Sequence, residues 1–164
     1  MEFHTNKEKV RKMITIIVII LVLSILEPFL LLLILPYGIF AYKKIRLYKS
    51  KKGKEFDESI EEFSKGNYEK SLESIEGVLD EKDFRSEALR IKAQCYYAIN
   101  NYQEFIKTLE LIPSKELEDN LTLMMAKGQC LEKLGFNEDA KILYESLSKK
   151  FPKSKFLKEK LGEL

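Results

Sequence analysis

Side chains that carry most metal and redox chemistry are scarce in this sequence of 164 residues. It has one histidine, His4, and two cysteines, Cys95 and Cys130. So few ligands exclude a metal cluster built from cysteine and histidine, and two cysteines cannot form a disulfide framework. The seven glycines have no phosphate-loop spacing, which excludes a nucleotide-binding loop of that kind. We expect no cofactor and no metal.

Nucleophilic and acid–base catalysis also lack a candidate site. His4 lies in a charged N-terminal tail, with no serine or cysteine motif near it. Paired acids such as Glu61-Glu62 are typical of helix surfaces, and nothing in the surrounding sequence would desolvate them and shift a carboxyl pKa. We therefore predict that the chain is not an enzyme.

The net charge of +2 conceals a division of the chain near Lys54. Residues 1–54 carry 11 basic and three acidic side chains, whereas residues 55–164 carry 17 basic and 23 acidic ones. A surface that binds nucleic acid needs positive charge to displace the counterions of the phosphates. The acidic half therefore argues against a nucleic-acid partner.

A long apolar run occupies residues 13–42, and Glu27 is its only charged residue. About 20 apolar residues in a helix are enough to cross a bilayer core, so the run predicts a membrane anchor behind a short basic flank, residues 1–12. Cleavage as a signal peptide is not expected. No small-x-small site follows residues 14–26, and apolar residues resume at Phe29.

The path of this anchor depends on Glu27 and Pro28, which interrupt the run. One interpretation is a single kinked transmembrane helix over residues 14–35. The other is a hairpin whose arms are residues 10–26 and 29–45, with the break at Glu27-Pro28. We prefer the single span, because a two-residue turn between spanning helices is very tight. A less favoured role for Glu27 is a carboxylate that pairs with a partner subunit inside the membrane.

Basic residues in the linker at residues 43–54 predict the orientation. Lysine and arginine are more frequent in cytoplasmic flanks, and Lys43, Lys44 and Arg46 begin such a flank. We therefore expect an integral protein of the cell membrane whose residues 55–164 face the cytoplasm. Its membrane partner is the lipid bilayer, and Cys95 and Cys130 would stay reduced.

The acidic half has the apolar spacing of helices. Apolar residues recur at intervals of three and four, and no segment alternates as a strand would. Turn signals occur at Gly66-Asn67, Asn100-Asn101 and Gly135, which are 34 and 35 residues apart. A fixed period of this length is typical of stacked helix pairs.

Similar residue types flank each turn: a small residue precedes it, and in most repeats small and aromatic residues follow it. In the third repeat these residues are Gly128, Leu131, Gly135, Ala140, Tyr144 and Pro152. In the second they are Ala93, Tyr96, Asn100, Tyr102 and Leu109, and in the first Ser59, Gly66, Asn67, Tyr68, Ser71 and Ile75. This pattern resembles the tetratricopeptide repeat (TPR) family over about residues 55–153.

The sequence departs from that family at several positions. No first helix has the leading tryptophan, Phe105 replaces a small residue in the second repeat, and Glu62 stands where a large apolar residue is usual. Another family of helix-pair repeats is the alternative. The resemblance implies an all-α protein, in which the N-terminal transmembrane helix precedes a short right-handed α-solenoid. That solenoid would contain three TPR-like helix pairs, at about residues 55–83, 86–113 and 121–153, and a capping helix at 154–164.

TPR arrays usually hold a peptide or partner helix on the concave surface formed by their first helices. The resemblance therefore implies a membrane-tethered scaffold that binds a protein partner there. We name the predicted residues the first-helix face. They are Arg90, Gln94, Tyr97, Met125, Gln129 and Glu132. The alternative function is an accessory subunit of a membrane complex, of the translocase or envelope-assembly type, which contacts that complex through its hydrophobic segment.

Overall fold

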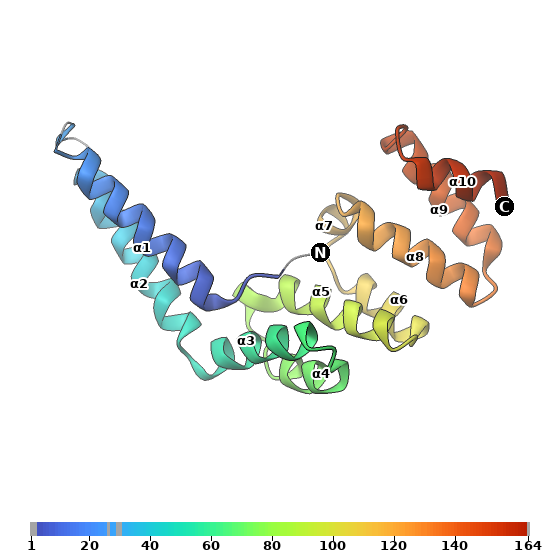
Figure 1. The fold of residues 1–164 in the computed structure, drawn as a ribbon, viewed down its shortest axis with the longest axis horizontal. Helices are drawn as coiled ribbons and strands as arrows, with labels where there is room; N and C mark the ends of the chain where they lie inside the picture. Colours follow the sequence, from blue (N-terminus) through green and yellow to red (C-terminus); the bar gives the residue numbers. More distant parts are fainter. Residues whose placement is uncertain (1–2, 26, 29–30, 164) are drawn as a thin grey trace. The chain divides into compact units, whose positions relative to one another are not determined.

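The computed structural model describes residues 3–25, 27–28 and 31–163, which contain helices and no strands (Figure 1). Its helices are α1 (Asn6–Leu23), α2 (Leu31–Tyr48), α3 (Lys51–Ser64), α4 (Tyr68–Glu76), α5 (Lys82–Ala98), α6 (Tyr102–Glu110), α7 (Ser114–Glu118), α8 (Leu121–Lys133), α9 (Asn137–Lys150) and α10 (Lys155–Glu163). The prediction of an all-α protein is confirmed for these residues.

The chain divides into two compact units, residues 2–84 and residues 85–164. The boundary lies in the first turn of α5. The first unit contains α1 to α4, and its core includes the stacked rings of Phe56 and Phe84, whose centroids are 4.8 Å apart. The second unit contains the rest of α5 and α6 to α10. Each unit is described by itself below.

The prediction of an N-terminal transmembrane helix is wrong. Among the described residues, no helix is both long enough and apolar enough to cross a membrane. The apolar run is shared between α1 and α2, and each helix draws part of its length from the charged flanks. Five of the first seven residues of α1 are charged, and the last turns of α2 contain Lys43, Lys44 and Arg46.

The helix boundaries also differ from the predicted segments at both ends of the run. Thr5 caps α1, because its side chain accepts a hydrogen bond from the Glu8 backbone while the Glu8 carboxylate accepts one from Thr5 N. This reciprocal pair starts α1 inside the predicted basic flank. Glu27 and Pro28 lie between α1 and α2, and both are exposed. The predicted linker, residues 43–54, is helical except at Lys49 and Ser50.

Three helix pairs follow, α3 with α4, α5 with α6 and α8 with α9, and each pair is joined by one of the predicted turns. A residue with positive φ lies in each turn: Gly66 at 82°, Asn100 at 60° and Gly135 at 85°. Glycine adopts this left-handed conformation without steric cost, and asparagine tolerates it better than most residues. The 34- and 35-residue period therefore corresponds to one repeated backbone geometry.

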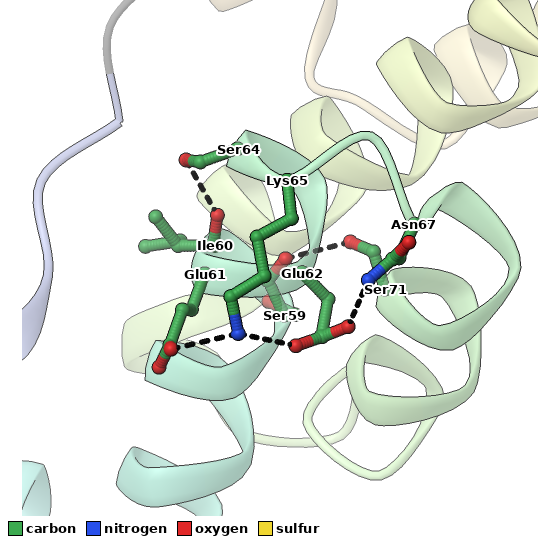
Figure 2. A network of polar contacts seen from close by, with 8 residues as sticks. All are labelled: Ser59, Ile60, Glu61, Glu62, Ser64, Lys65, Asn67 and Ser71. Atoms are coloured by element: carbon green, nitrogen blue, oxygen red, sulfur yellow. Dashed lines mark hydrogen bonds and ion pairs between the residues drawn. The ribbon is translucent and has the colours of Figure 1, made fainter.

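Figure 2 shows how polar contacts hold the turn between α3 and α4. Glu62 accepts hydrogen bonds from Lys65 Nζ at 2.9 Å and from Asn67 Nδ2 at 2.7 Å. These two bonds hold the pKa of the Glu62 carboxyl below its usual range. Nearby, the buried Ser71 hydroxyl donates to the Ser59 carbonyl at 2.7 Å. Glu62, which lacks the expected apolar character, therefore fixes the turn instead of filling the core.

The third pair depends on a close approach between α8 and α9. Gly128 of α8 faces the buried ring of Tyr144 on α9, and a Cβ at position 128 would lie 2.5 Å from Tyr144 Cζ. Ala140, Tyr144, Leu147 and Leu157 form the buried cluster here, so α10 covers the end of this pair. Helix α10 lies within residues 154–164, the segment predicted as a capping helix.

Candidate functional site

Helices α1 and α2 lie side by side and run in opposite directions (Figure 1). Their apolar side chains are largely exposed. The only buried apolar residues described on these helices are Met13 and Ala41. We call the pair the apolar hairpin. Its exposed large apolar residues are Ile14, Ile16, Val18, Ile19, Leu21, Val22, Leu23, Ile25, Leu32, Leu33, Leu35, Ile39, Phe40 and Tyr42.

Exposure on this scale distinguishes the apolar hairpin from the rest of the protein. Ile25, Leu32 and Leu35 are 80%, 73% and 73% exposed, and the exposed residues continue along most of both helices. A monomeric protein in water rarely exposes an apolar surface of this extent, and such surfaces mark contacts with membranes or other proteins. The hairpin is therefore the strongest candidate for a functional surface in the first unit.

Cations gather at one end of this hairpin, because antiparallel packing brings the start of α1 beside the end of α2. We call this end the basic base. Its residues are Lys7, Lys9, Arg11, Lys12, Lys43, Lys44, Arg46 and Lys49. Two of them have partners within the unit. Lys44 Nζ lies 2.6 Å from Asp83, and Lys9 Nζ lies 4.9 Å from the centre of the Phe56 ring.

The remaining cations of the basic base face solvent. Lys7, Arg11, Lys12, Lys43, Arg46 and Lys49 are exposed, and no carboxylate among the described residues forms an ion pair with them. The sequence-predicted topology residues Lys43 and Arg46 are therefore available to an external anion, whereas Lys44 holds α2 to Asp83. Glu27 and Pro28 lie at the opposite end of the hairpin, between its helices.

Hydrogen bonds from Asn6 connect the basic base to α3. The Asn6 backbone N–H donates to Asp57 Oδ1 at 2.5 Å, and Asn6 Nδ2 donates to the buried Gly53 carbonyl at 2.8 Å. Burial raises the pKa of the Asp57 carboxyl, although the Asn6 N–H and the charge of Lys9 oppose the shift. These bonds hold the first turn of α1 on α3. The hairpin is therefore joined to α3 twice, through Asn6 and through the chain connection from α2 to α3.

The residues of the first-helix face lie in the second unit, where several already have intramolecular partners. Tyr97 Oη donates to Gln129 Oε1 at 2.9 Å, which links α5 to α8. Glu132 Oε2 lies 3.2 Å from Lys160 Nζ, which links α8 to α10. These contacts connect α5 to α8 and α8 to α10. Gln94 and Met125 are half-buried on α5 and α8.

Arg90 differs from its predicted availability. Its guanidinium lies 3.2 Å from Glu116 Oε2, and Glu116 also accepts a hydrogen bond from Ser86. Glu116 belongs to α7, which the sequence did not predict. An internal carboxylate therefore already pairs with this guanidinium. Glu116 and Lys160 are the partners that sequence reasoning missed, because each is brought near by a fold contact over 26 or more residues.

Potential metal ligands do not gather in groups of three in the part of the chain that the structure describes. Cys95 and Cys130 are free and buried, and burial raises the pKa of the Cys130 thiol to about 12. A thiol with so high a pKa is a poor nucleophile at neutral pH.

Comparisons with known proteins give no relative from which a role could be transferred. No family model matches the chain, and no curated protein and no solved structure matches it either. The candidate surfaces therefore rest on the residues and geometry given above.

Proposed function

We propose that this chain is a membrane-associated interaction module, in which the apolar hairpin enters one leaflet of a bilayer and the helix pairs remain at its surface. The single observation that carries this proposal is the exposure of apolar side chains on both helices of the hairpin. Lipid can surround both helices at once. The basic base would then lie among anionic headgroups, which are concentrated in the cytoplasmic leaflet.

The dimensions of the apolar hairpin agree with entry into one leaflet. From Met13 to Leu23, α1 rises about 15 Å, which is about half of a hydrocarbon core 30 Å thick. This depth requires no helix to cross the bilayer. Immersion of Glu27 at the hairpin end costs about 2.5 kcal/mol or more. Transfer of fourteen partly exposed apolar side chains contributes on the order of 10 kcal/mol, so apolar transfer outweighs that cost.

The helix pairs supply the second part of the proposed function, which is binding of a protein partner. What supports it is the first-helix face, where Tyr97 on α5 and Gln129 and Glu132 on α8 are partly exposed, and Tyr97 is hydrogen-bonded to Gln129. Aromatic and amide side chains of this kind supply contact area and hydrogen bonds in protein interfaces. The hairpin would hold such a partner close to the membrane.

Flotation with vesicles tests the membrane part. Full-length protein is mixed with vesicles of phosphatidylcholine and phosphatidylglycerol and centrifuged in a density gradient. We expect the wild type to float. The double variant Ile19→Asp, Leu35→Asp should float at least about tenfold less, because it places two charges in hydrocarbon. Both residues are exposed, so the fold should be retained.

Ile142→Asp is the matched control, because Ile142 is 63% exposed on α9 and lies outside the hairpin. It should float like the wild type. Wild-type protein that does not float, or a double variant that floats equally well, would contradict the proposal. Recovery in membranes only together with other proteins would favour the accessory-subunit alternative.

Thiol labelling tests the one-leaflet path. Cysteines are introduced at Thr5 and Lys51 in a background that lacks Cys95 and Cys130, and intact cells are treated with an impermeant thiol reagent. Entry from the cytoplasmic leaflet leaves both positions protected. Labelling of residue 5 alone would mean that the chain crosses the membrane, and labelling of residue 51 would contradict the cytoplasmic placement.

Affinity capture tests the partner part. Detergent extracts are compared between the wild type and a variant with Arg90→Ala and Tyr97→Ala. We expect the proteins retained by the wild type to be lost from the variant. Identical sets of retained proteins would exclude the first-helix face as the binding surface.

A further inference from the structure

An open groove of about 530 Å³ runs along α2, and its lining changes from apolar to basic along the helix. Among the residues that line the groove are Leu35, Gly38, Ile39, Tyr42, Lys43 and Arg46. They recur at intervals of three and four residues, so they lie on one face of α2. With Ile34 at its apolar end, the groove extends about 18 Å along the helix axis, at 1.5 Å per residue.

Gly38 contributes no side chain to the groove. A Cβ at this position would have open space around it and would meet no atom within 4 Å. Leu35 and Ile39 are 73% and 53% exposed beside it. An interior glycine costs a helix about 1 kcal/mol relative to alanine, and no close packing against Gly38 offsets that cost.

The basic end of the groove matches an anion. Lys43 and Arg46 are one turn apart and exposed, and neither has an ion-pair partner among the described residues. Arginine binds a phosphate through two parallel hydrogen bonds, and lysine adds a point charge. Tyr42, which is 67% exposed, lies between the apolar and the basic residues, as aromatic residues do at a membrane interface.

We propose that this groove binds one anionic phospholipid, with an acyl chain along Gly38 and the headgroup phosphate against Lys43 and Arg46. This inference rests on the proposed function, because it names the lipid contact of the same hairpin. The polarity of the groove agrees with the direction of hairpin entry: its apolar end points toward the hairpin break at Glu27, and its basic end belongs to the basic base. The headgroup and acyl chains of the bound lipid would then lie at the same depths as those of the surrounding leaflet.

Native mass spectrometry of the full-length chain in detergent tests this site. The protein is titrated with dipalmitoyl phosphatidylglycerol, and glycerol phosphate serves as a probe with a phosphate group but no acyl chains. We expect one bound phospholipid per chain and no comparable binding of glycerol phosphate. Equal binding of both probes would overturn the proposal, since the apolar part of the groove would then contribute nothing.

Two sets of variants separate the two ends of the groove. Gly38→Leu fills the apolar end and should lower phospholipid affinity at least about tenfold, which corresponds to 1.4 kcal/mol. Lys43→Gln with Arg46→Gln should lower it about fivefold for each cation, because each contributes about 1 kcal/mol near an anionic surface. Lys155→Gln with Lys158→Gln is the control, since it removes the same charge from exposed positions of α10 outside the hairpin and should leave affinity within about twofold.

The outcomes distinguish this inference from the proposed function. Gly38→Leu should retain its helical circular dichroism and should still float with vesicles, because the rest of the apolar hairpin is intact. Unchanged phospholipid affinity in Gly38→Leu would overturn the lipid site. Flotation of the wild type would still support membrane association in that case. A lipid-free dimer that Gly38→Leu dissociates would also overturn it, because a second copy of the chain would then cover the groove.

Discussion

Gly128 and the ring of Tyr144 are in closer contact than any residue with a Cβ would permit. A Cβ at position 128 would lie 2.5 Å from Cζ and 2.7 Å from the hydroxyl oxygen. Tyr144 is fully buried, so its ring has no free space into which it could move. The separation of α8 and α9 is therefore set by the absence of one carbon atom.

Gly128→Ala should destabilise the second unit. Overpacking in a core typically costs about 1–3 kcal/mol, whereas alanine gains about 1 kcal/mol over glycine in a helix. We expect a net decrease of up to about 2 kcal/mol in the free energy of unfolding, measured with urea. Gly162→Ala in α10 is the control, because no atom lies within 4 Å of its added Cβ. That variant should be neutral or slightly stabilised, and equal losses in both variants would contradict the packing argument.

The three turns predict different effects for two kinds of substitution. Gly66→Ala and Gly135→Ala place a Cβ in the left-handed region, which costs about 1–2 kcal/mol each. Asn100→Gly removes a Cβ from the same conformation but also the Oδ1 that accepts a hydrogen bond from Tyr102 Oη at 2.7 Å, so it should lose less stability than the alanine variants. Thermal unfolding of the three variants measures the effects. A loss of stability in Asn100→Gly equal to that of the alanine variants would show that backbone conformation does not decide stability at these turns.

Asp57 and Glu62 should change stability with pH in opposite directions. The pKa of Asp57 is raised by burial, so ionisation disfavours the folded state, and stability is lost as pH rises through the folded pKa. The pKa of Glu62 is lowered by the Lys65 and Asn67 hydrogen bonds, so its contribution is present above the unfolded pKa and lost as pH falls through the folded pKa.

Each carboxylate can be measured against its amide variant between about pH 3 and pH 7. Relative to the wild type, Asp57→Asn should become more stable as pH rises, and Glu62→Gln should become less stable. Differences that do not change with pH, or that have the same sign for both variants, would contradict the assigned causes. The turn bonds of Glu62 are exposed to solvent, so salt should reduce its effect more than that of Asp57.

Glu27→Leu tests the depth of the apolar hairpin. If the hairpin end lies in hydrocarbon, removal of the carboxylate should increase affinity for vesicles at least about tenfold, because a charge there costs about 2.5 kcal/mol or more. Glu159→Leu is the control, since Glu159 is exposed on α10. Equal affinity of Glu27→Leu and the wild type would place this residue in water and exclude the immersed end.

Cys130 should be protected from thiol reagents in the folded protein. Its thiol is buried, and its pKa of about 12 leaves almost no thiolate at neutral pH. Alkylation at pH 7.5 should therefore be at least about a hundredfold slower in buffer than in denaturant. Rapid labelling of Cys130 in buffer would mean that the contact between α8 and its neighbours opens readily.

Helix pairs could be predicted from this sequence because their signals are local. The spacing of apolar residues and the turn residues Gly66, Asn100 and Gly135 each depend on a few neighbouring positions. The Thr5–Glu8 capping box was equally local, and it would have placed the start of α1 before the apolar run. The single span was wrong because hydropathy treats residues 13–42 as one segment, although Glu27 and Pro28 separate two helices.

The first-helix face shows where local signals end. The position of each of its residues within its repeat could be inferred from the repeat spacing. Two of them, Tyr97 and Gln129, form a hydrogen bond between α5 and α8. The pairing of Arg90 with Glu116 could not be inferred, because it requires α7 to fold back over residues 26 positions earlier. Lys160 likewise reaches Glu132 only after α10 has packed on α9. Charges that look free in a sequence can therefore be neutralised by distant segments.

The link between Asn6 and Asp57 has a consequence for the order of events during synthesis. Helices α1 and α2 precede the rest of the described chain, so the ribosome releases the apolar hairpin before Asp57 and Gly53 can accept the hydrogen bonds of Asn6. During that interval the hairpin lacks the Asn6 hydrogen bonds to α3. Its apolar surface is then exposed at the ribosomal exit tunnel. Under the membrane association proposed above, the hairpin would therefore meet lipid while most of the protein is still being translated.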